Sequence, residues 1–244
     1  LDIWESNTPQ RSTTGERLRH QDYTYARRNR RLWADEIRRA WRHETTVDDY
    51  YEPITRNGLR LLLSAPIEGE LPQLTARLPH VTLLELQGSE RPVAHLDAFL
   101  ALFPNLRLLA VRDMPLNALP AATPGMPHLN ELILSNCSIT LNARSAQTLS
   151  AMTRLRSLDL YNNPLGITPD VTNMPQLSFL DLNHTGITEV PPGLANRPRL
   201  EAAILSNNRI SALPAELFTL PAAVSEHFDL ANNPFTPTTL EQVK

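Results

Sequence analysis

The stretch LRSLDLYNNPL, residues 155–165, decides the fold that this sequence predicts. Leu158 and Leu160 alternate with polar residues at a period of two, which is typical of a short strand whose leucines face a core. Asn163 follows at a turn, where its side-chain amide can bond to carbonyl groups that burial would otherwise leave unpaired. One such strand and turn cannot bury its own apolar edge, so the pattern predicts a stack of similar units.

The same pattern, L-x-x-L-x-L-x-x-(N/C/T)-x-(L/I), recurs along most of the chain. Successive copies begin at residues 58, 81, 106, 129, 155, 177, 200 and 225, and the first two copies are degenerate. This spacing predicts about eight stacked units with parallel strands. Leu-Pro pairs such as Leu213-Pro214 fall between the strands, where proline fixes φ and no amide donor is needed. Residues 93–103 and 142–149 have helical spacing and are expected on the opposite, convex side.

This pattern resembles the leucine-rich repeat, and the resemblance covers residues 58–235. It implies an α/β leucine-rich-repeat solenoid, or horseshoe, with a parallel sheet on its concave face and an N-terminal helical cap. The expected organisation is a flexible lead-in over residues 1–22, the helical cap over 23–57, the repeats over 58–235, and the start of a C-terminal cap or linker over 236–244.

The expected cap centres on a helix over residues 23–43. Trp33, Ile37 and Trp41 recur four residues apart and predict one apolar face. Arginine fills much of the remaining surface: Arg27, Arg28, Arg30, Arg31, Arg38, Arg39 and Arg42. Such a helix is compatible with binding nucleic acid or acidic lipid. Interspersed acidic residues favour the other interpretation, a cap that covers the first repeat, followed by a short helix or extended link over residues 47–54.

Composition and motifs narrow the classes of function. The 244 residues are 41% hydrophobic and 20% charged with a net charge of −3, which indicates a soluble globular chain rather than a disordered one. No run of about 18 uncharged apolar residues predicts a membrane span. The single cysteine, Cys137, excludes an internal disulfide, and its place at the ninth repeat position predicts a buried structural role. We find no catalytic, cofactor-binding or metal motif, so no enzyme, cofactor or metal is expected within these residues.

The concave face is the expected binding surface, because positions 3, 5 and 7 of each repeat point outward there. Tyr161 and Phe179 lie among acidic residues at mid-sheet, a composition found at protein-binding hot spots. The acidity argues against nucleic acid, whose phosphates require basic residues. We expect a monomer that binds a protein partner through Arg112, Glu131, Asp159, Tyr161, Phe179, Asp181, Asn183, His184 and His227. The alternative is an ordinary solvated sheet face.

Several short phrases of the sequence are similar to one group of bacterial effectors, the IpaH/SspH class and its longer relatives. In these effectors leucine-rich repeats precede a novel-type E3 ubiquitin ligase domain. The matching phrases are Arg39-Ala40-Trp41-Arg42, Gly69-Glu70-Leu71-Pro72, residues 149–165, Met174-Pro175-Gln176-Leu177 and Pro192-Gly193-Leu194. The resemblance implies that the repeats recognise a substrate and can restrain the ligase domain. It also implies a virulence protein made in the bacterial cytoplasm and delivered by type III secretion into the host cell cytoplasm.

No catalytic residue carries over from this group. Its chemistry belongs to a cysteine in a Cys-x-Asp motif of the ligase domain, whereas Cys137 is followed by Ser138-Ile139. Because the chain starts at Leu1 rather than Met, we expect a fragment of a longer protein that has no activity alone. The alternative is a leucine-rich-repeat scaffold or regulatory domain of another bacterial protein without ubiquitin chemistry.

Overall fold

The computed structural model describes residues 1–11, 15–45 and 58–243. They fall into two units, which are described separately: unit 1 comprises residues 1–116 and 120–129, and unit 2 comprises residues 117–119 and the chain from 130 onward. The link expected over residues 47–54 lies outside the described residues. Among the described helices, none combines the length and the apolar character that crossing a membrane requires.

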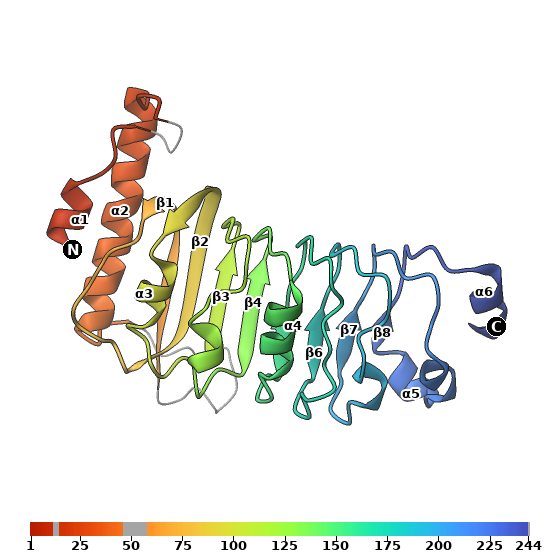
Figure 1. Cartoon of the computed structure of the whole chain (residues 1–244). Coiled ribbons are helices and arrows are strands. Elements are labelled where there is room, and N and C mark those ends of the chain that lie inside the picture. The colour runs from red at the N-terminus through yellow and green to blue at the C-terminus, as the bar shows by residue number, and fades with distance from the viewer. Residues whose placement is uncertain (12–14, 46–57, 244) are drawn as a thin grey trace. The chain divides into compact units, whose positions relative to one another are not determined.

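In the described part of unit 1, helices precede a set of parallel strands (Figure 1). Its elements are α1 (Asp2–Ser6), α2 (His20–Trp41), β1 (Leu59–Glu70), β2 (Val81–Ala94), α3 (Leu96–Leu100), β3 (Leu108–Arg112) and a 3-10 turn at Thr123–Gly125. Leu84 of β2 lies opposite Leu61 of β1 and Leu109 of β3. All three leucines are buried, which confirms the inward placement that the repeat pattern predicts.

Strands β1 and β2 are longer than the repeat pattern predicts. The pattern weakens after Leu63 and Leu86, yet the two strands continue to pair as far as Glu70 and Ala94, with register shifts on the way. Backbone pairing continues without regular leucines because main-chain groups supply the hydrogen bonds. Of the helical segment predicted over residues 93–103, only α3 forms, because its first residues still belong to β2.

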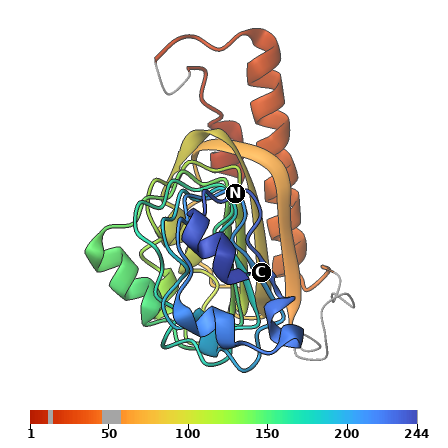
Figure 2. The ribbon, with the colours of Figure 1, turned by 90° about the vertical axis from the view of Figure 1, so that its right-hand side faces the viewer.

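Helix α2 caps unit 1 by covering the free edge of β1 (Figure 2). The indole Nε1 of Trp33 donates a hydrogen bond of 2.7 Å to the carbonyl of Ala65, and Asn29 Nδ2 donates one of 2.7 Å to the carbonyl of Pro66. An edge strand leaves such carbonyls without a neighbouring strand. The side chains of α2 therefore replace a strand at this end of the sheet.

The predicted apolar face of α2 is right at Trp33 and Ile37 and wrong at Trp41. Trp33 is 0% exposed and Trp41 is 55% exposed. The helix ends at Trp41, and its last buried contact is made by Ala40, whose carbonyl oxygen lies 2.8 Å from His80 Nε2. The indole of Trp41 therefore lies beyond the surface that α2 covers.

The segment predicted as a flexible lead-in, residues 1–22, contains α1 and the first turn of α2. Trp4 Nε1 donates to the carbonyl of Glu70 at 2.7 Å. Arg30 Nη1 donates to the carbonyl of Trp4 at 2.8 Å, and the Arg30 guanidinium lies 4.8 Å from the centre of the Trp4 ring. These contacts depend on the far end of β1, so the local polar sequence does not predict them.

In unit 2 the described strands run parallel in chain order. Its elements are β4 (Glu131–Ser135), α4 (Ala143–Ser150), β5 (Ser157–Asp159), β6 (Phe179–Asp181), a 3-10 turn at Leu194–Asn196, β7 (Ala202–Ile204), a 3-10 turn at Ala215–Thr219, α5 (Ala222–Ser225), β8 (Phe228–Asp229) and α6 (Pro237–Val243). The helix expected over residues 142–149 is confirmed as α4, which Asn142 and Ser145 cap reciprocally. Residues 236–244, the expected cap or linker, contain α6.

Where unit 2 has asparagine at the ninth repeat position, its side chain links that turn to the preceding one. Asn163 Nδ2 donates to the carbonyls of Leu134 and Leu160 at 2.6 and 2.9 Å, as the sequence predicts. Its Oδ1 also accepts hydrogen bonds from the backbone amides of Cys137 and Ile139 at 3.0 and 2.9 Å. Cys137 is buried at the preceding ninth position, in agreement with its predicted structural place.

Replacing Leu160 with alanine is expected to destabilise the protein by about 2–5 kcal/mol, because a buried leucine leaves a cavity when truncated. The side chain of Leu160 is 0% exposed. Urea unfolding measures the change, with Leu240→Ala as the control because Leu240 is 50% exposed. Equal losses in the two variants would contradict the inward placement of Leu160.

Trp33→Ala is expected to cost about 3–5 kcal/mol of unfolding free energy, since it removes a buried ring and leaves the carbonyl of Ala65 without its donor. Trp41→Ala is the matched control on the same helix, and its exposed side chain predicts a loss below about 1 kcal/mol. Thermal unfolding of both variants tests the cap. A small effect at Trp33 would show that α2 does not stabilise the edge of β1.

Candidate protein-binding surface

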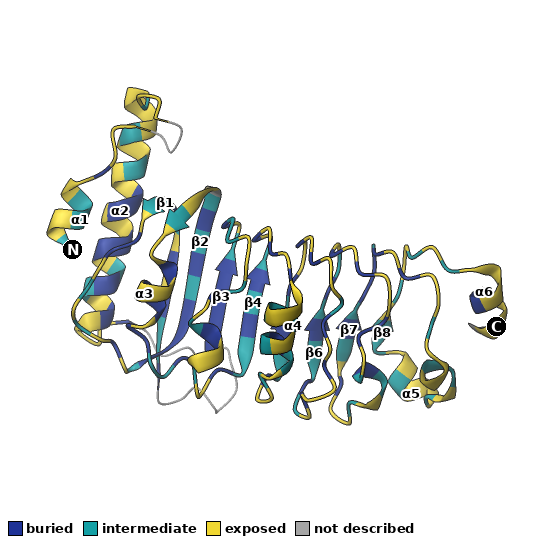
Figure 3. Ribbon diagram, viewed as in Figure 1, coloured by how far each residue is buried: buried dark blue, intermediate teal, exposed yellow. Residues whose placement is uncertain are grey.

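The strands of unit 2 present one side of their sheet outward (Figure 3). In β5, β6 and β7, a buried central residue lies between two partly exposed ones. We define the unit 2 sheet face by positions 3, 5 and 7 of its repeats: Glu131, Ile133, Ser135, Ser157, Asp159, Tyr161, Phe179, Asp181, Asn183, Ala202, Ile204, Ser206, His227, Asp229 and Ala231. Strand period places these side chains on the side opposite the leucine core.

Three aspartates at position 5 make the same hydrogen bond at the ends of their strands. Asp159 and Asp181 face each other across β5 and β6, and Asp229 pairs with Ile204 in the next strands. Oδ1 of each carboxylate accepts a hydrogen bond of 2.8 to 3.0 Å from the backbone amide two residues later. One carboxylate oxygen of each aspartate therefore holds the chain as it leaves the strand.

The second carboxylate oxygens of the three aspartates differ in their hydrogen-bond donors. Oδ2 of Asp159 accepts a hydrogen bond of 3.1 Å from Ser135, and Oδ2 of Asp229 accepts one of 2.8 Å from Ser206. Both serines occupy position 7 of the preceding repeat. Tyr161 occupies that position before Asp181, and no side chain in the described residues donates to Oδ2 of Asp181.

Tyr161 turns toward the end of the next strand instead. Its ring centre lies 6.1 Å from that of His184 in an edge-on arrangement, and its side chain is 38% exposed. Nδ1 of His184 lies 2.6 Å from Oδ1 of Asn183. These contacts bring Tyr161, Asn183 and His184 together beside Asp181, as the sequence predicts for neighbouring repeats.

The backbone conformation at position 8 of the repeat explains the place of His184. His184 has a φ of 56° at position 8, and Asn136, Asn162 and Asn207 have φ values of 53 to 56° at the same position. Residues with short polar side chains tolerate this left-handed region better than β-branched residues do. The position-8 residues are therefore selected first by backbone geometry, a constraint that the leucine pattern does not reveal.

Burial changes the proton affinity of two acids on this face. The pKa of Asp181 is raised by burial, and the negative charges of Asp159 and Asp229 raise it further, while the amide of Asn183 opposes the shift. Burial also raises the pKa of Glu131, and the positive charge of Arg156 opposes that change. Burial thus disfavours the ionised form of both carboxylates, and the charge of Arg156 offsets part of this effect at Glu131.

Arg112 is the one predicted site residue that falls outside unit 2. It belongs to unit 1, where its Nη1 lies 3.1 Å from Oε2 of Glu85, and Arg60 pairs with the other oxygen of Glu85 at 2.8 Å. Glu131 on β4 and His227 before β8 remain on the unit 2 sheet face. Sequence reasoning missed the supporting role of Ser135 and Ser206, although their place at position 7 indicates it.

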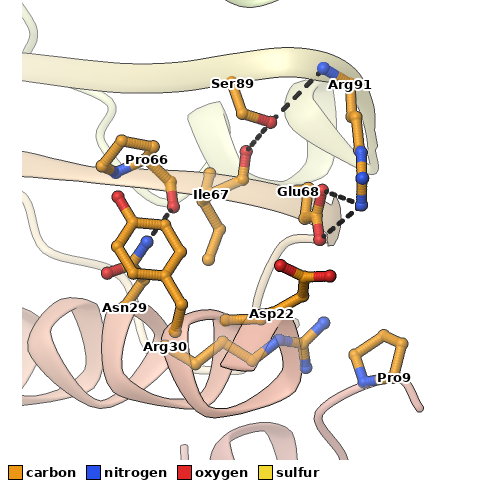
Figure 4. Close-up of a pocket in the computed structure, with 11 residues that line it drawn as sticks. Pro9, Asp22, Asn29, Arg30, Pro66, Ile67, Glu68, Ser89 and Arg91 are labelled. Atoms are coloured by element: carbon orange, nitrogen blue, oxygen red, sulfur yellow. Dashed lines mark hydrogen bonds and ion pairs between the residues drawn. The ribbon is translucent and has the colours of Figure 1, made fainter. Parts of the chain in front are cut away.

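Unit 1 contains a pocket of about 300 Å³ between α2 and the far ends of β1 and β2 (Figure 4). Glu68 and Arg91 form an ion pair of 2.9 Å on one wall, and Arg30 lies on the opposite wall. Burial lowers the pKa of Arg30, while Glu70 and Glu68 oppose the shift. The negative charges of Glu68 and Glu70 on β1 thus act on Arg30 of α2 at this pocket. In the part of the chain that the structure describes, no three His, Cys, Asp or Glu residues group to hold a metal ion.

Comparisons agree with this architecture. The family model described as Leucine Rich Repeat matches residues 154–174. Podocan of Mus musculus is 37% identical over 132 residues, which cover 52% of this chain and 20% of podocan. The chain has the leucine-rich-repeat fold.

Solved structures show the same fold. The leucine-rich-repeat protein LIC12759 of Leptospira interrogans matches with a TM-score of 0.55 and 22% identity, over 72% of this chain and 46% of that chain. The internalin-like protein lmo2027 of Listeria monocytogenes matches with a TM-score of 0.53 and 19% identity, over 82% of this chain and 65% of that chain. The chain spans about a fifth of the length of podocan and less than half of the Leptospira chain.

Asp181→Asn is expected to leave the protein at least as stable as the wild type at neutral pH. The raised pKa means that the native state binds a proton at Asp181 more readily than the unfolded state does. Wild-type stability therefore falls as the pH rises through the range just above the ordinary carboxyl pKa, and the asparagine variant escapes that loss. Urea unfolding at a series of pH values tests the sign, since the advantage of the variant should shrink toward acid pH. A variant whose disadvantage grows as the pH rises would contradict the prediction.

Proposed function

We propose that the unit 2 sheet face is the docking surface for a protein partner. The observation that carries the proposal is Tyr161, a 38% exposed aromatic side chain surrounded by half-buried polar groups at mid-sheet. Tyrosine is enriched at binding hot spots because its ring supplies a large contact area and its hydroxyl a hydrogen bond. Phe179, half-buried at position 3 of the next repeat, adds apolar area beside it.

Pre-organisation supports the same proposal. The three position-5 aspartates are held by backbone amides, and Asn162 Nδ2 donates to Asn136 Oδ1 at 2.9 Å along the rim of the face. Side chains that are already ordered lose little conformational entropy when a partner binds. A rigid face of this kind selects a complementary partner instead of adapting to many.

We propose further that the chain is the substrate-recognition domain, and the restraining domain, of a secreted bacterial effector E3 ubiquitin ligase. The resemblance of residues 149–165 and 174–177 to effectors of the IpaH/SspH class supports this assignment. In this proposal a monomer is made in the bacterial cytoplasm and delivered into the host cell cytoplasm. The chain holds the substrate, and a ligase domain elsewhere in the protein transfers ubiquitin.

Tyr161→Ala combined with Phe179→Ala is expected to weaken partner binding by more than about 2 kcal/mol, or about thirtyfold, because the pair supplies the aromatic area of the face. Calorimetric titration of the purified partner measures the change, and unfolding experiments check that the variant stays folded. Leu240→Ala, an exposed apolar residue outside the sheet face, is the control. Unchanged affinity would place the docking surface elsewhere.

A reconstituted ubiquitin-transfer assay tests the ligase assignment. The full-length protein, with E1, E2 and ubiquitin, should build ubiquitin chains, and the present 244 residues alone should not. Tyr161→Ala with Phe179→Ala in the full-length protein should lose transfer to the substrate and keep transfer to the ligase itself. An absence of transfer even after the repeats are deleted would leave a scaffold without ubiquitin chemistry.

A further inference from the structure

One carboxylate oxygen on the unit 2 sheet face differs from its equivalents in the neighbouring repeats. Asp159, Asp181 and Asp229 occupy the same repeat position and make the same backbone hydrogen bond. Ser135 and Ser206 satisfy the second oxygens of Asp159 and Asp229, whereas Oδ2 of Asp181 has no donor in the described residues. Asp181 is therefore the aspartate whose outward oxygen remains available to a partner.

The neighbours of Asp181 in the adjoining repeats are Tyr161 and Ile204. Position 7 of one repeat adjoins position 5 of the next, as the bond between Ser135 and Asp159 shows, so Tyr161 lies beside Asp181. On its other flank, Ile204 of β7 pairs with Asp181 in register. Asp181 is half-buried at this place, and burial weakens the solvation of an ionised carboxylate.

The charge of the whole face has one sign. Its fifteen positions hold Glu131, Asp159, Asp181 and Asp229 and contain neither lysine nor arginine. Arg156, the basic residue that acts on this face, compensates Glu131 rather than Asp181. A complementary partner must therefore bring positive charge to the centre of the face.

We propose that the partner inserts an arginine side chain that pairs with Asp181 and packs against Tyr161. The inference rests on the proposed docking surface and adds the chemistry of its occupant. A guanidinium group suits this place, because its planar fork can bond to Oδ2 while its flat face contacts an aromatic ring. An acidic or phosphate-bearing partner would meet four carboxylates and is disfavoured.

The test selects peptides from a displayed library of random sequences on the whole chain. Peptides that lose binding to Tyr161→Ala with Phe179→Ala are retained as ligands of the sheet face, and folded variants are verified by unfolding. Each arginine of such a peptide is then replaced with citrulline, which keeps the shape and removes the charge. Affinities are measured on the wild type, on Asp181→Asn and on the matched control Asp229→Asn.

The expected result is a double-mutant cycle centred on Asp181. One arginine-to-citrulline change should weaken binding at least about tenfold on the wild type and on Asp229→Asn, and should have little effect on Asp181→Asn. Sheet-face ligands without arginine, or an arginine whose effect persists in Asp181→Asn, would overturn the inference and leave the docking surface intact. If no selected peptide depends on Tyr161 and Phe179, the docking surface itself fails and the inference falls with it.

Discussion

The hydrogen bonds of the ninth-position asparagines are the interaction on which unit 2 depends. Strands β5, β6 and β7 contain three residues each, so ladder hydrogen bonds alone satisfy only a small part of each repeat. The turns that follow bury backbone groups that water cannot reach. Asn208 Nδ2 donates to the carbonyls of Leu182 and Leu205 at 2.8 and 3.0 Å, and its Oδ1 accepts from the amide of Thr185 at 3.0 Å. Where the next repeat has asparagine at its ninth position, that side chain thus completes the preceding turn.

The same physical problem arises at the free edge of unit 1, and a helix solves it there. The outer carbonyls of β1 have no preceding strand, and the side chains of Trp4, Asn29 and Trp33 supply the missing donors. These donors come from two helices that the repeat pattern does not include. Burial of the tryptophan rings adds the apolar contact that a further repeat would otherwise provide.

Rigid turns also shape the chemistry of the sheet face. One carboxylate oxygen of each position-5 aspartate accepts a hydrogen bond from the backbone amide two residues later. The other oxygen can accept a hydrogen bond from a neighbouring side chain. Serine at the preceding position 7 satisfies that oxygen internally, whereas tyrosine leaves it facing outward. The exchange of serine for tyrosine therefore adds an exposed aromatic ring beside a carboxylate oxygen that no side chain in the described residues donates to. Tyr161 differs in this way from Ser135 and Ser206, which occupy the equivalent position in their repeats.

The sequence by itself determined the repeats, their parallel strands, the buried leucines, the ninth-position bonds and helix α4, because each follows from local period or from contacts between equivalent positions. Tyr161, Asn183, His184 and Asp181 come together for the same reason. Only the tertiary structure decided the length of β1 and β2, the helix within residues 1–22 and the exposure of Trp41. These features depend on backbone pairing and on contacts between distant segments, and no periodic pattern of side chains records such contacts.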